Sequence, residues 1–348
     1  MKRLAIAALI IAAIWGSSSA AFAAAAYKIV TASERGTYFE IGRDLAKLVA
    51  PDAGIDLDVL PTAGSAENVR LLRYEPGVKF AIVQADVFQA FIDRAEKGQT
   101  VASALIRPLR VILPLYNTEI HFIVRADSPL NYLHDIKDAR INGGLVGSGA
   151  ALITSTLYSM MFNTPIPDAN VSFLSNEEAL VKLITDKSVD VVTVAAGQPA
   201  PIIANMKPEA KALIKLLKFD ENNPLSKPIL QTYVGATLRA SSYPNILTED
   251  VRTVAVGAYL VTYDYNLKDT VDHMTKFGRA LCENFPTLQA QGHPKWREVS
   301  LALPELAPGW IYYPATTRAI RACVARRGVP KRPAAACSQQ ERILGLCS

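Results

Sequence analysis

Glycines and small uncharged polar side chains stand where predicted strands give way to predicted helices. In the first such stretch, Gly36 and Thr37 follow the apolar, β-branched strand 27–31, and apolar residues continue at helical spacing to Val49. The first turn of a helix presents backbone N–H groups without intrahelical partners and carries a partial positive charge, so a small anion such as a carboxylate binds well there. We therefore expect this loop to bind a ligand. The alternative is that Gly36 only forms a tight turn and Tyr38 only packs.

Two further strand–loop–helix units follow directly along the chain. Strand 55–60 passes through Gly64-Ser65 into a helix, and strand 79–83 ends at Gln84 before another helix. Three consecutive units predict a parallel sheet with right-handed crossovers, in which ligands bind beyond the carboxyl ends of the strands. Thr37, Ser65 and Gln84 are placed at those ends. Their uncharged side chains can orient a polar ligand without a heavy desolvation cost.

The second half of the chain repeats this organisation. Two extended segments, 111–116 and 120–125, predict a crossover into a second lobe. There, a glycine-rich stretch at 143–149 opens a helix, and strand 189–194 is followed by Gln198-Pro199. A glycine-rich loop before a helix again offers N–H groups to an anion; the alternative is an ordinary turn. Its glycines fit neither the dinucleotide-binding pattern nor the phosphate-loop pattern, so we do not expect a nucleotide.

The length of the chain predicts two lobes, because about 320 residues is more than one core usually organises. We expect residues 27–116 plus 232–326 to form one lobe and residues 120–228 the other, with two extended crossovers between them. Residues 327–348 are expected to be a cysteine-containing C-terminal tail.

The N-terminus predicts export. A basic lead, an apolar run at 4–15 and Ala21-Phe22-Ala23 are typical of a signal peptide, here 1–26, with cleavage near Ala23 to Ala26. No cysteine lies near that site, which argues against a lipid anchor, and no later apolar run reaches the roughly 18 residues that span a bilayer. Loss of Lys2 and Arg3 lowers the formal charge from +5 to +3, too little to indicate nucleic acid. We expect a soluble periplasmic protein.

The cysteines and histidines indicate disulfides rather than a metal site. All four cysteines lie in the last quarter of the chain, and in an oxidising compartment they allow three pairings. We favour Cys282 with Cys323, which would tie two helices of one lobe, and Cys337 with Cys347, which would close a short loop in the tail. The cysteines lack paired zinc-type spacing and the four histidines form no i, i+4 pair, so we expect no metal and no cofactor.

Four segments in the same order resemble the TAXI family, the solute-binding receptors of TRAP transporters. They are Gly36-Thr37-Tyr38-Phe39-x-Ile41-Gly42, the segment 64–72, the segment 81–86 and Val146-Gly147-Ser148-Gly149, within a collinear match from about Tyr27 to Arg326. The resemblance implies an α/β, two-lobed periplasmic-binding-protein (Venus-flytrap) fold, type II-like, with two crossover strands. It also implies capture of a small carboxylate, a glutamate-like amino acid or a dicarboxylate, for delivery to TRAP membrane permease subunits by a monomer.

Carried over by position, the resemblance implies a pocket of ten residues: Thr37, Tyr38, Ser65, Asn68, Gln84, Asp86, Ser148, Gly149, Gln198 and Pro199. The chain departs from the family pattern at Glu34-Arg35, at Glu40 and at Ala150, which leaves the ligand class open. Arg35 could reach over the cleft or face solvent.

Two other classes of function were weighed against transport. An exported enzyme would need a nucleophile or an acid–base set, and the sequence has no Gly-x-Ser-x-Gly elbow and no cysteine beside a candidate histidine. We therefore expect no enzymatic activity. A ligand-sensing protein for a signalling partner would use the same pocket, so pocket residues do not separate sensing from transport.

Overall fold

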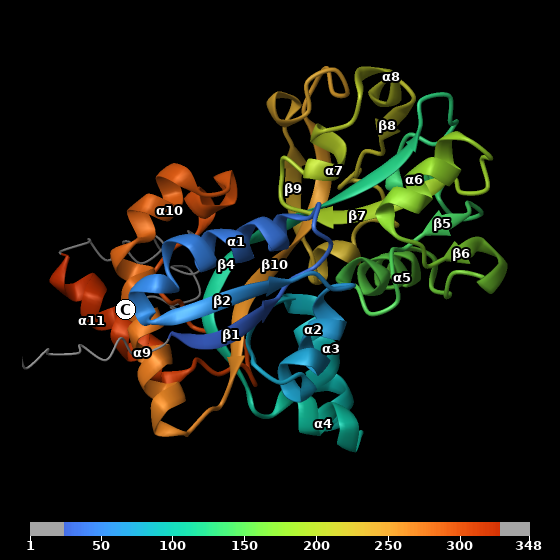
Figure 1. The fold of residues 1–348 in the computed structure, drawn as a ribbon. Coiled ribbons are helices and arrows are strands. Elements are labelled where there is room, and N and C mark those ends of the chain that lie inside the picture. Colours follow the sequence, from blue (N-terminus) through green and yellow to red (C-terminus); the bar gives the residue numbers. More distant parts are fainter. Residues whose placement is uncertain (1–23, 328–348) are drawn as a thin grey trace, which may run out of the picture.

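The computed structural model describes residues 24–327. Most of the expected signal peptide and nearly all of the expected tail, including the Cys337–Cys347 pair, lie outside the described residues. Figure 1 shows two lobes joined by two long strands, with the disulfide-bearing helices at the far end of the first lobe. Within residues 24–327, no helix has the length and apolarity needed to cross a bilayer.

The first lobe is built from the three expected strand–loop–helix units. Strands β1 (Ala25–Val30), β2 (Ile55–Leu60) and β3 (Val78–Gln84) are parallel and are followed by α1 (Thr37–Leu48), α2 (Ser65–Tyr74) and α3 (Ala85–Glu96). The strand order is β2-β1-β3-β10-β4. The carboxyl ends of these three strands therefore point to the same edge of the sheet, toward the second lobe, as the sequence predicts.

Two long antiparallel strands, β4 (Leu109–Arg125) and β10 (Val251–Tyr263), connect the lobes. The end of β10 pairs with β3 in the first lobe, whereas its beginning pairs with β9 (Val234–Leu238). The end of β4 pairs with β7 (Val191–Ala196) and β8 (Ile214–Leu216). Because both strands run through both lobes, the two halves belong to one hydrogen-bonded sheet. The two extended segments expected at 111–116 and 120–125 form a single strand, since residues 117–119 keep their pairing with β10.

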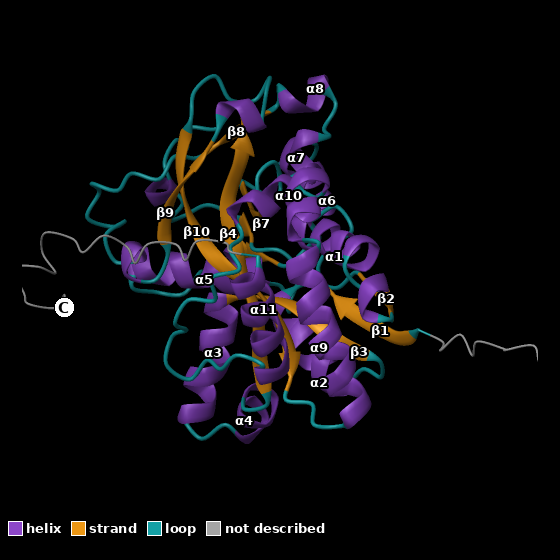
Figure 2. Ribbon diagram, turned by 90° about the vertical axis from the view of Figure 1, so that its left-hand side faces the viewer, coloured by secondary structure: helices purple, strands orange, loops and turns teal. Residues whose placement is uncertain are grey.

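The second lobe has the shorter strands. β5 (Ile141–Asn142) pairs in parallel with β6 (Val171–Ser172) and with β7. The helices of this lobe are α5 (Gly149–Phe162), α6 (Asn176–Ile184), α7 (Pro201–Ala204) and α8 (Pro208–Lys211). Helices cover both faces of the sheet in the side view (Figure 2). The architecture is the α/β, two-lobed periplasmic-binding-protein fold with two crossover strands that the resemblance implies.

The apolar clusters lead us to propose that the chain returns to the first lobe later than residue 232. Ile229, Tyr233 and Val254 belong to one apolar cluster of the second lobe, and Tyr243 and Val251 belong to another. By contrast, Leu260 and Val261 pack in the two clusters of the first lobe. We propose that the boundary lies within β10, and the exact division of the chain into lobes stays a proposal.

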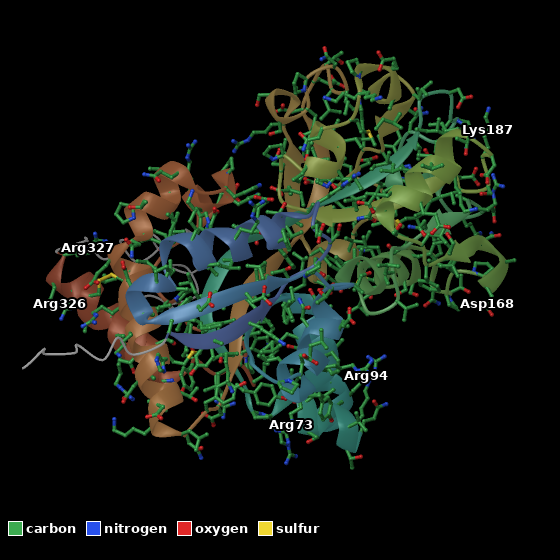
Figure 3. The ribbon with its side chains drawn as sticks, viewed as in Figure 1. Arg73, Arg94, Asp168, Lys187, Arg326 and Arg327 are labelled. Carbon is green, nitrogen blue, oxygen red and sulfur yellow. A yellow bond between two sulfur atoms is a disulfide. The ribbon has the colours of Figure 1, made fainter. Side chains whose placement is uncertain are left out.

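The remaining helices complete the first lobe. They are α4 (Thr100–Ile106), α9 (Lys268–Glu283), α10 (Phe285–Gln291), α11 (Pro314–Arg326) and the 3-10 helix η6 (Pro294–Glu298). Five further 3-10 turns are η1 (Pro51–Ala53), η2 (Leu133–Asp135), η3 (Asp168–Asn170), η4 (Ile229–Gln231) and η5 (Ala240–Ser242). A disulfide between Cys282 and Cys323 joins α9 to α11, which carries Arg326 at its outer end (Figure 3). The expected pairing of these two cysteines is confirmed.

We predict that the double variant Cys282→Ala, Cys323→Ala unfolds about 2–4 kcal/mol more easily than the parent protein, because the unfolded chain regains the entropy of a closed loop. Both cysteines are buried and alanine is apolar, so the two substitutions bury no unpaired polar group. Urea unfolding measures the difference. Equal stability of the variant and the oxidised parent would contradict the prediction, and the reduced parent serves as the matched control.

Candidate ligand-binding site

A cavity of about 270 Å³ lies between the lobes. The first lobe contributes the loops that follow β1 and β2, together with Gln84 at the end of β3. The second lobe contributes the loop before α5, the start of α6 and the end of β7. The charged residues among those that line the cavity are Arg35 and Glu177. The wall is otherwise made of neutral polar and small apolar groups, so backbone dipoles dominate its electrostatics.

Four helices begin at this cavity. The residues before their first turns, Gly36 of α1, Gly64 of α2, Ser148 of α5 and Ser175 of α6, all line it. The Ser148 hydroxyl accepts a hydrogen bond from the amide of Ala151 at 3.1 Å, and the Ser175 hydroxyl does the same for Glu178 at 3.2 Å. Each N-terminus adds a partial positive charge, so the cavity is suited to an anion.

The start of α2 is occupied by the other lobe. The amides of Ala66 and Glu67 both donate to the carbonyl oxygen of Gly147 at 3.0 Å. Two donors that a ligand could have used therefore hold the second lobe against the first. Across the cleft, the Thr37 hydroxyl donates to the carbonyl oxygen of Gly197 at 3.0 Å. In both contacts a backbone carbonyl oxygen of the second lobe is the acceptor.

Glycines make this close approach possible. A Cβ atom on Gly149 would lie 1.6 Å from Oε1 of Gln84, in the opposite lobe. Gly64 has a φ of +133°, and a Cβ atom added to it would lie 3.3 Å from the Cα atom of Ser148. A Cβ on Gly197 would lie 2.9 Å from the Lys295 side chain. A side chain at any of these positions would require a neighbouring group of the opposite lobe to shift.

Six of the ten expected pocket residues line the cavity: Thr37, Tyr38, Ser65, Gln84, Ser148 and Gly149. The Tyr38 hydroxyl lies 3.2 Å from the Thr118 hydroxyl, and burial raises the pKa of Tyr38, so it is a neutral hydrogen-bonding group. Gln84 is 3% exposed, and its Oε1 has no hydrogen-bond partner among the described residues.

Asn68 is not part of the cavity wall. Its side-chain amide donates to the carbonyl oxygens of Thr31, at 2.5 Å, and Ile82, at 2.8 Å. Its oxygen accepts from the Thr62 hydroxyl at 2.7 Å. Every hydrogen-bonding group of this buried side chain is used to tie α2 to β1 and β3, so its role in the structure is to hold the first lobe together.

Asp86 also lies away from the lining residues. Its Oδ2 accepts a hydrogen bond from the Tyr233 hydroxyl at 3.1 Å, which links the start of α3 to the segment before β9. Burial raises the pKa of Asp86 to about 6, although the hydrogen bonds from Val87 and Tyr233 act to lower it.

Gln198 and Pro199 lie behind the cavity rather than on its wall. The Gln198 side-chain amide donates to Oε1 of Glu119 at 3.0 Å and to the carbonyl oxygen of Thr237 at 2.8 Å. Glu119 also accepts from Nζ of Lys295 at 2.5 Å. Sequence reasoning missed Glu119 and Lys295. Glu119 could have been noticed as an acidic residue inside the apolar run 109–124. No feature of the sequence marked Lys295.

Ser175 and Asn176 are among the residues that line the cavity and that sequence reasoning missed. Ser175 precedes Asn176-Glu177-Glu178, which is the residue pattern of a helix N-cap, and that signal could have added a fourth helix terminus to the site. For metal chemistry, residues 24–327 hold no group of three or more histidine, cysteine or carboxylate side chains that could ligate an ion.

A family model, that of the NMT1-like family, matches residues 29–311. The chain belongs to the NMT1-like family. The NMT1-like range includes all loops of the cavity, both crossover strands and Lys295, and it ends before α11. No curated protein matches the sequence.

Three of the similar solved structures are those of binding proteins. The periplasmic binding protein BugD is 15% identical and matches 86% of this chain and 94% of its own, with a TM-score of 0.49. A binding-protein component of an ABC phosphonate transporter from Pseudomonas aeruginosa is 12% identical over 92% and 93% of the two chains, with a TM-score of 0.48. An ancestral arginine-binding protein bound to arginine is 13% identical over 78% and 95%, with a TM-score of 0.45. Likenesses of this size carry no argument about function.

We predict that Gly149→Ala in this NMT1-like protein gives a more open molecule, because the added methyl group meets the Gln84 side chain across the cleft. Small-angle X-ray scattering should show a larger radius of gyration than for the parent. Gly143→Ala is the matched control, since a Cβ there meets its neighbours at an ordinary 3.5 Å within one lobe. Superimposable scattering curves for Gly149→Ala and the parent would refute the contact.

Because the pKa of Asp86 is raised, we expect the free energy of unfolding of the protein to depend on pH. An acid whose pKa is about 6 in the folded protein and 3.8 ordinarily holds its proton more firmly when folded. Its contribution to the free energy of unfolding is therefore fully present below about pH 4 and is lost as the pH rises through about 6. Asp86→Asn should stabilise the protein at pH 7.5 by about 1–2 kcal/mol and change little at pH 4.

Urea unfolding at the two pH values tests this expectation, with Asp93→Asn, an exposed position on the same helix, as the control. Destabilisation of Asp86→Asn at pH 7.5 would mean that the hydrogen bond from Tyr233 outweighs the burial of the charge.

Proposed function

We propose that the protein is an extracytoplasmic solute receptor that binds a small carboxylate in the cavity between its lobes. The observation that carries the proposal is the convergence of the N-termini of α1, α5 and α6 on one cavity whose lining is uncharged apart from Arg35 and Glu177. An anionic ligand that enters the cavity exchanges hydrogen bonds from water for hydrogen bonds from the protein. Helix N-termini supply backbone N–H donors together with a favourable dipole, so a buried cation is not required.

The donors are available in this structure. Among the described residues, no acceptor is bound to the first two amides of each of these helices, which are those of Thr37 and Tyr38, Gly149 and Ala150, and Asn176 and Glu177. Hydrogen bonds to a charged group are each worth roughly 1.5–3 kcal/mol, so three or four of them support micromolar binding. Ser65 and Gln84 lie beside these donors and would fix the orientation of the ligand.

The resemblance to the TAXI family supports the rest of the proposal. It assigns delivery of the ligand to TRAP-type membrane permease subunits, and it names glutamate-like amino acids and dicarboxylates as candidate ligands. The predicted signal peptide 1–26 is consistent with a periplasmic receptor that works outside the inner membrane. The proposal is one of binding, with no chemical step.

Calorimetry against a panel of amino acids, monocarboxylates and dicarboxylates tests the proposal. We expect the parent protein to bind at least one of them with micromolar affinity, and Gln84→Ala to weaken that affinity about tenfold, the equivalent of about 1.4 kcal/mol for one lost hydrogen bond. Gln99→Ala, at an exposed position before α4, is the matched control.

If Gln84→Ala binds as tightly as Gln99→Ala, the cavity is not the binding site. A large loss in Arg35→Ala alone would show that a side-chain charge, rather than the helix termini, holds the ligand.

A further inference from the structure

The cavity wall carries one residue of each charge, and the two come from different lobes. Arg35 lies in the loop between β1 and α1 of the first lobe, and Glu177 lies in the first turn of α6 in the second. Both residues also line a separate, open depression beside α6 and α7. Because Arg35 and Glu177 border both hollows, they share the rim that separates the cavity from the depression.

Neither charged group is paired elsewhere in the described residues. Within residues 24–327, no ion pair includes Arg35 or Glu177. The hydrogen bond from Arg35 to the Ser33 hydroxyl, at 3.3 Å, uses the backbone amide and not the guanidinium. Among the residues that line the two hollows, each is therefore the only one of opposite charge to the other.

Helix α6 is the element that such a pair would hold. The starts of α1 and α5 are already fixed by hydrogen bonds between the lobes, which are made at Thr37 and at Gly147. Within the part of the chain that the structure describes, no hydrogen bond or ion pair links α6 to the first lobe. Contact between Glu177 and Arg35 would supply that link at the helix terminus that borders the cavity.

We propose that Arg35 and Glu177 form an ion pair across the cavity rim when a ligand is bound, and that this pair holds the N-terminus of α6 against the ligand. The inference rests on the proposed function, because it uses the same cavity and the same helix terminus. Arg35 is then a positioning residue, which acts on α6 through Glu177 and does not contact the carboxylate of the ligand. Its charge also compensates that of Glu177, which by itself would repel an anion.

The direction in which Glu177→Gln changes the affinity tests the inference. Loss of a negative charge from the cavity wall should strengthen the binding of an anion if Glu177 contributes only to the electric field. The ion pair predicts the opposite. We expect Glu177→Gln to weaken binding about twofold to fivefold, which at its upper end is the conversion of about 1 kcal/mol for an exposed ion pair.

A double-mutant cycle shows whether the two residues act together. Arg35→Gln should weaken binding at least as much as Glu177→Gln, and the double variant should bind no more weakly than Arg35→Gln, because the pair can be lost only once. Calorimetry with acetate, succinate and glutamate measures the affinities, first at low salt and then in about 1 M sodium chloride. At the higher salt, where the Debye length is about 3 Å, the parent should lose its advantage over Glu177→Gln.

Glu40→Gln and Arg43→Gln are the matched controls, because Glu40 and Arg43 form an exposed ion pair within α1 and line neither hollow. Both control variants should bind like the parent. Unchanged or tighter binding by Glu177→Gln overturns the inference. Independent, additive losses in the cycle also overturn it, since Arg35 then contacts the ligand directly. In both cases the parent still binds and the proposed receptor stands. If no carboxylate binds the parent, the proposed function fails and the inference falls with it.

Discussion

The buried carboxylate of Glu119 joins the parts of the molecule that meet behind the cavity. Glu119 lies on the crossover strand β4, and it accepts hydrogen bonds from Nζ of Lys295 in η6 of the first lobe and from the backbone and side-chain amides of Gln198 in the second. Lys295 is fully buried, and its ammonium group also contacts Glu298 and the carbonyl oxygen of Asn117. Removal of two charges from water is costly, and the cost is offset only because nearly every donor and acceptor of the pair is used.

The position of the cavity depends on this interaction. Gln198 follows Gly197, and Gly197 packs against both Lys295 and Thr37, so the end of β7 is held against the start of α1. The N-termini of α1 and α6 then both border the cavity, whose charged lining residues are Arg35 and Glu177. The charge that holds the framework together therefore lies behind the cavity, whereas the backbone dipoles of the helix N-termini border it.

The contacts between the lobes also divide the helix termini into two sets. The start of α2 is satisfied by the carbonyl oxygen of Gly147, so it stabilises the approach of the lobes, whereas the starts of α1, α5 and α6 stay open to the cavity. The residues matched by the NMT1-like family model, 29–311, include every group involved.

The sequence by itself determined the strand–loop–helix units and the glycine loops, because hydrophobic periodicity, helix caps and turn residues are local properties. It could not distinguish Ser65, which faces the cavity, from Asn68, one turn later on the same helix, because only the packing of α2 against β1 and β3 gives the Asn68 amide its backbone partners. Nor could it pair Glu119 with Lys295, which are 176 positions apart. Such contacts form only when segments that are distant in the sequence pack together, and tertiary structure alone decides which polar groups are buried against each other and which stay open to the cavity.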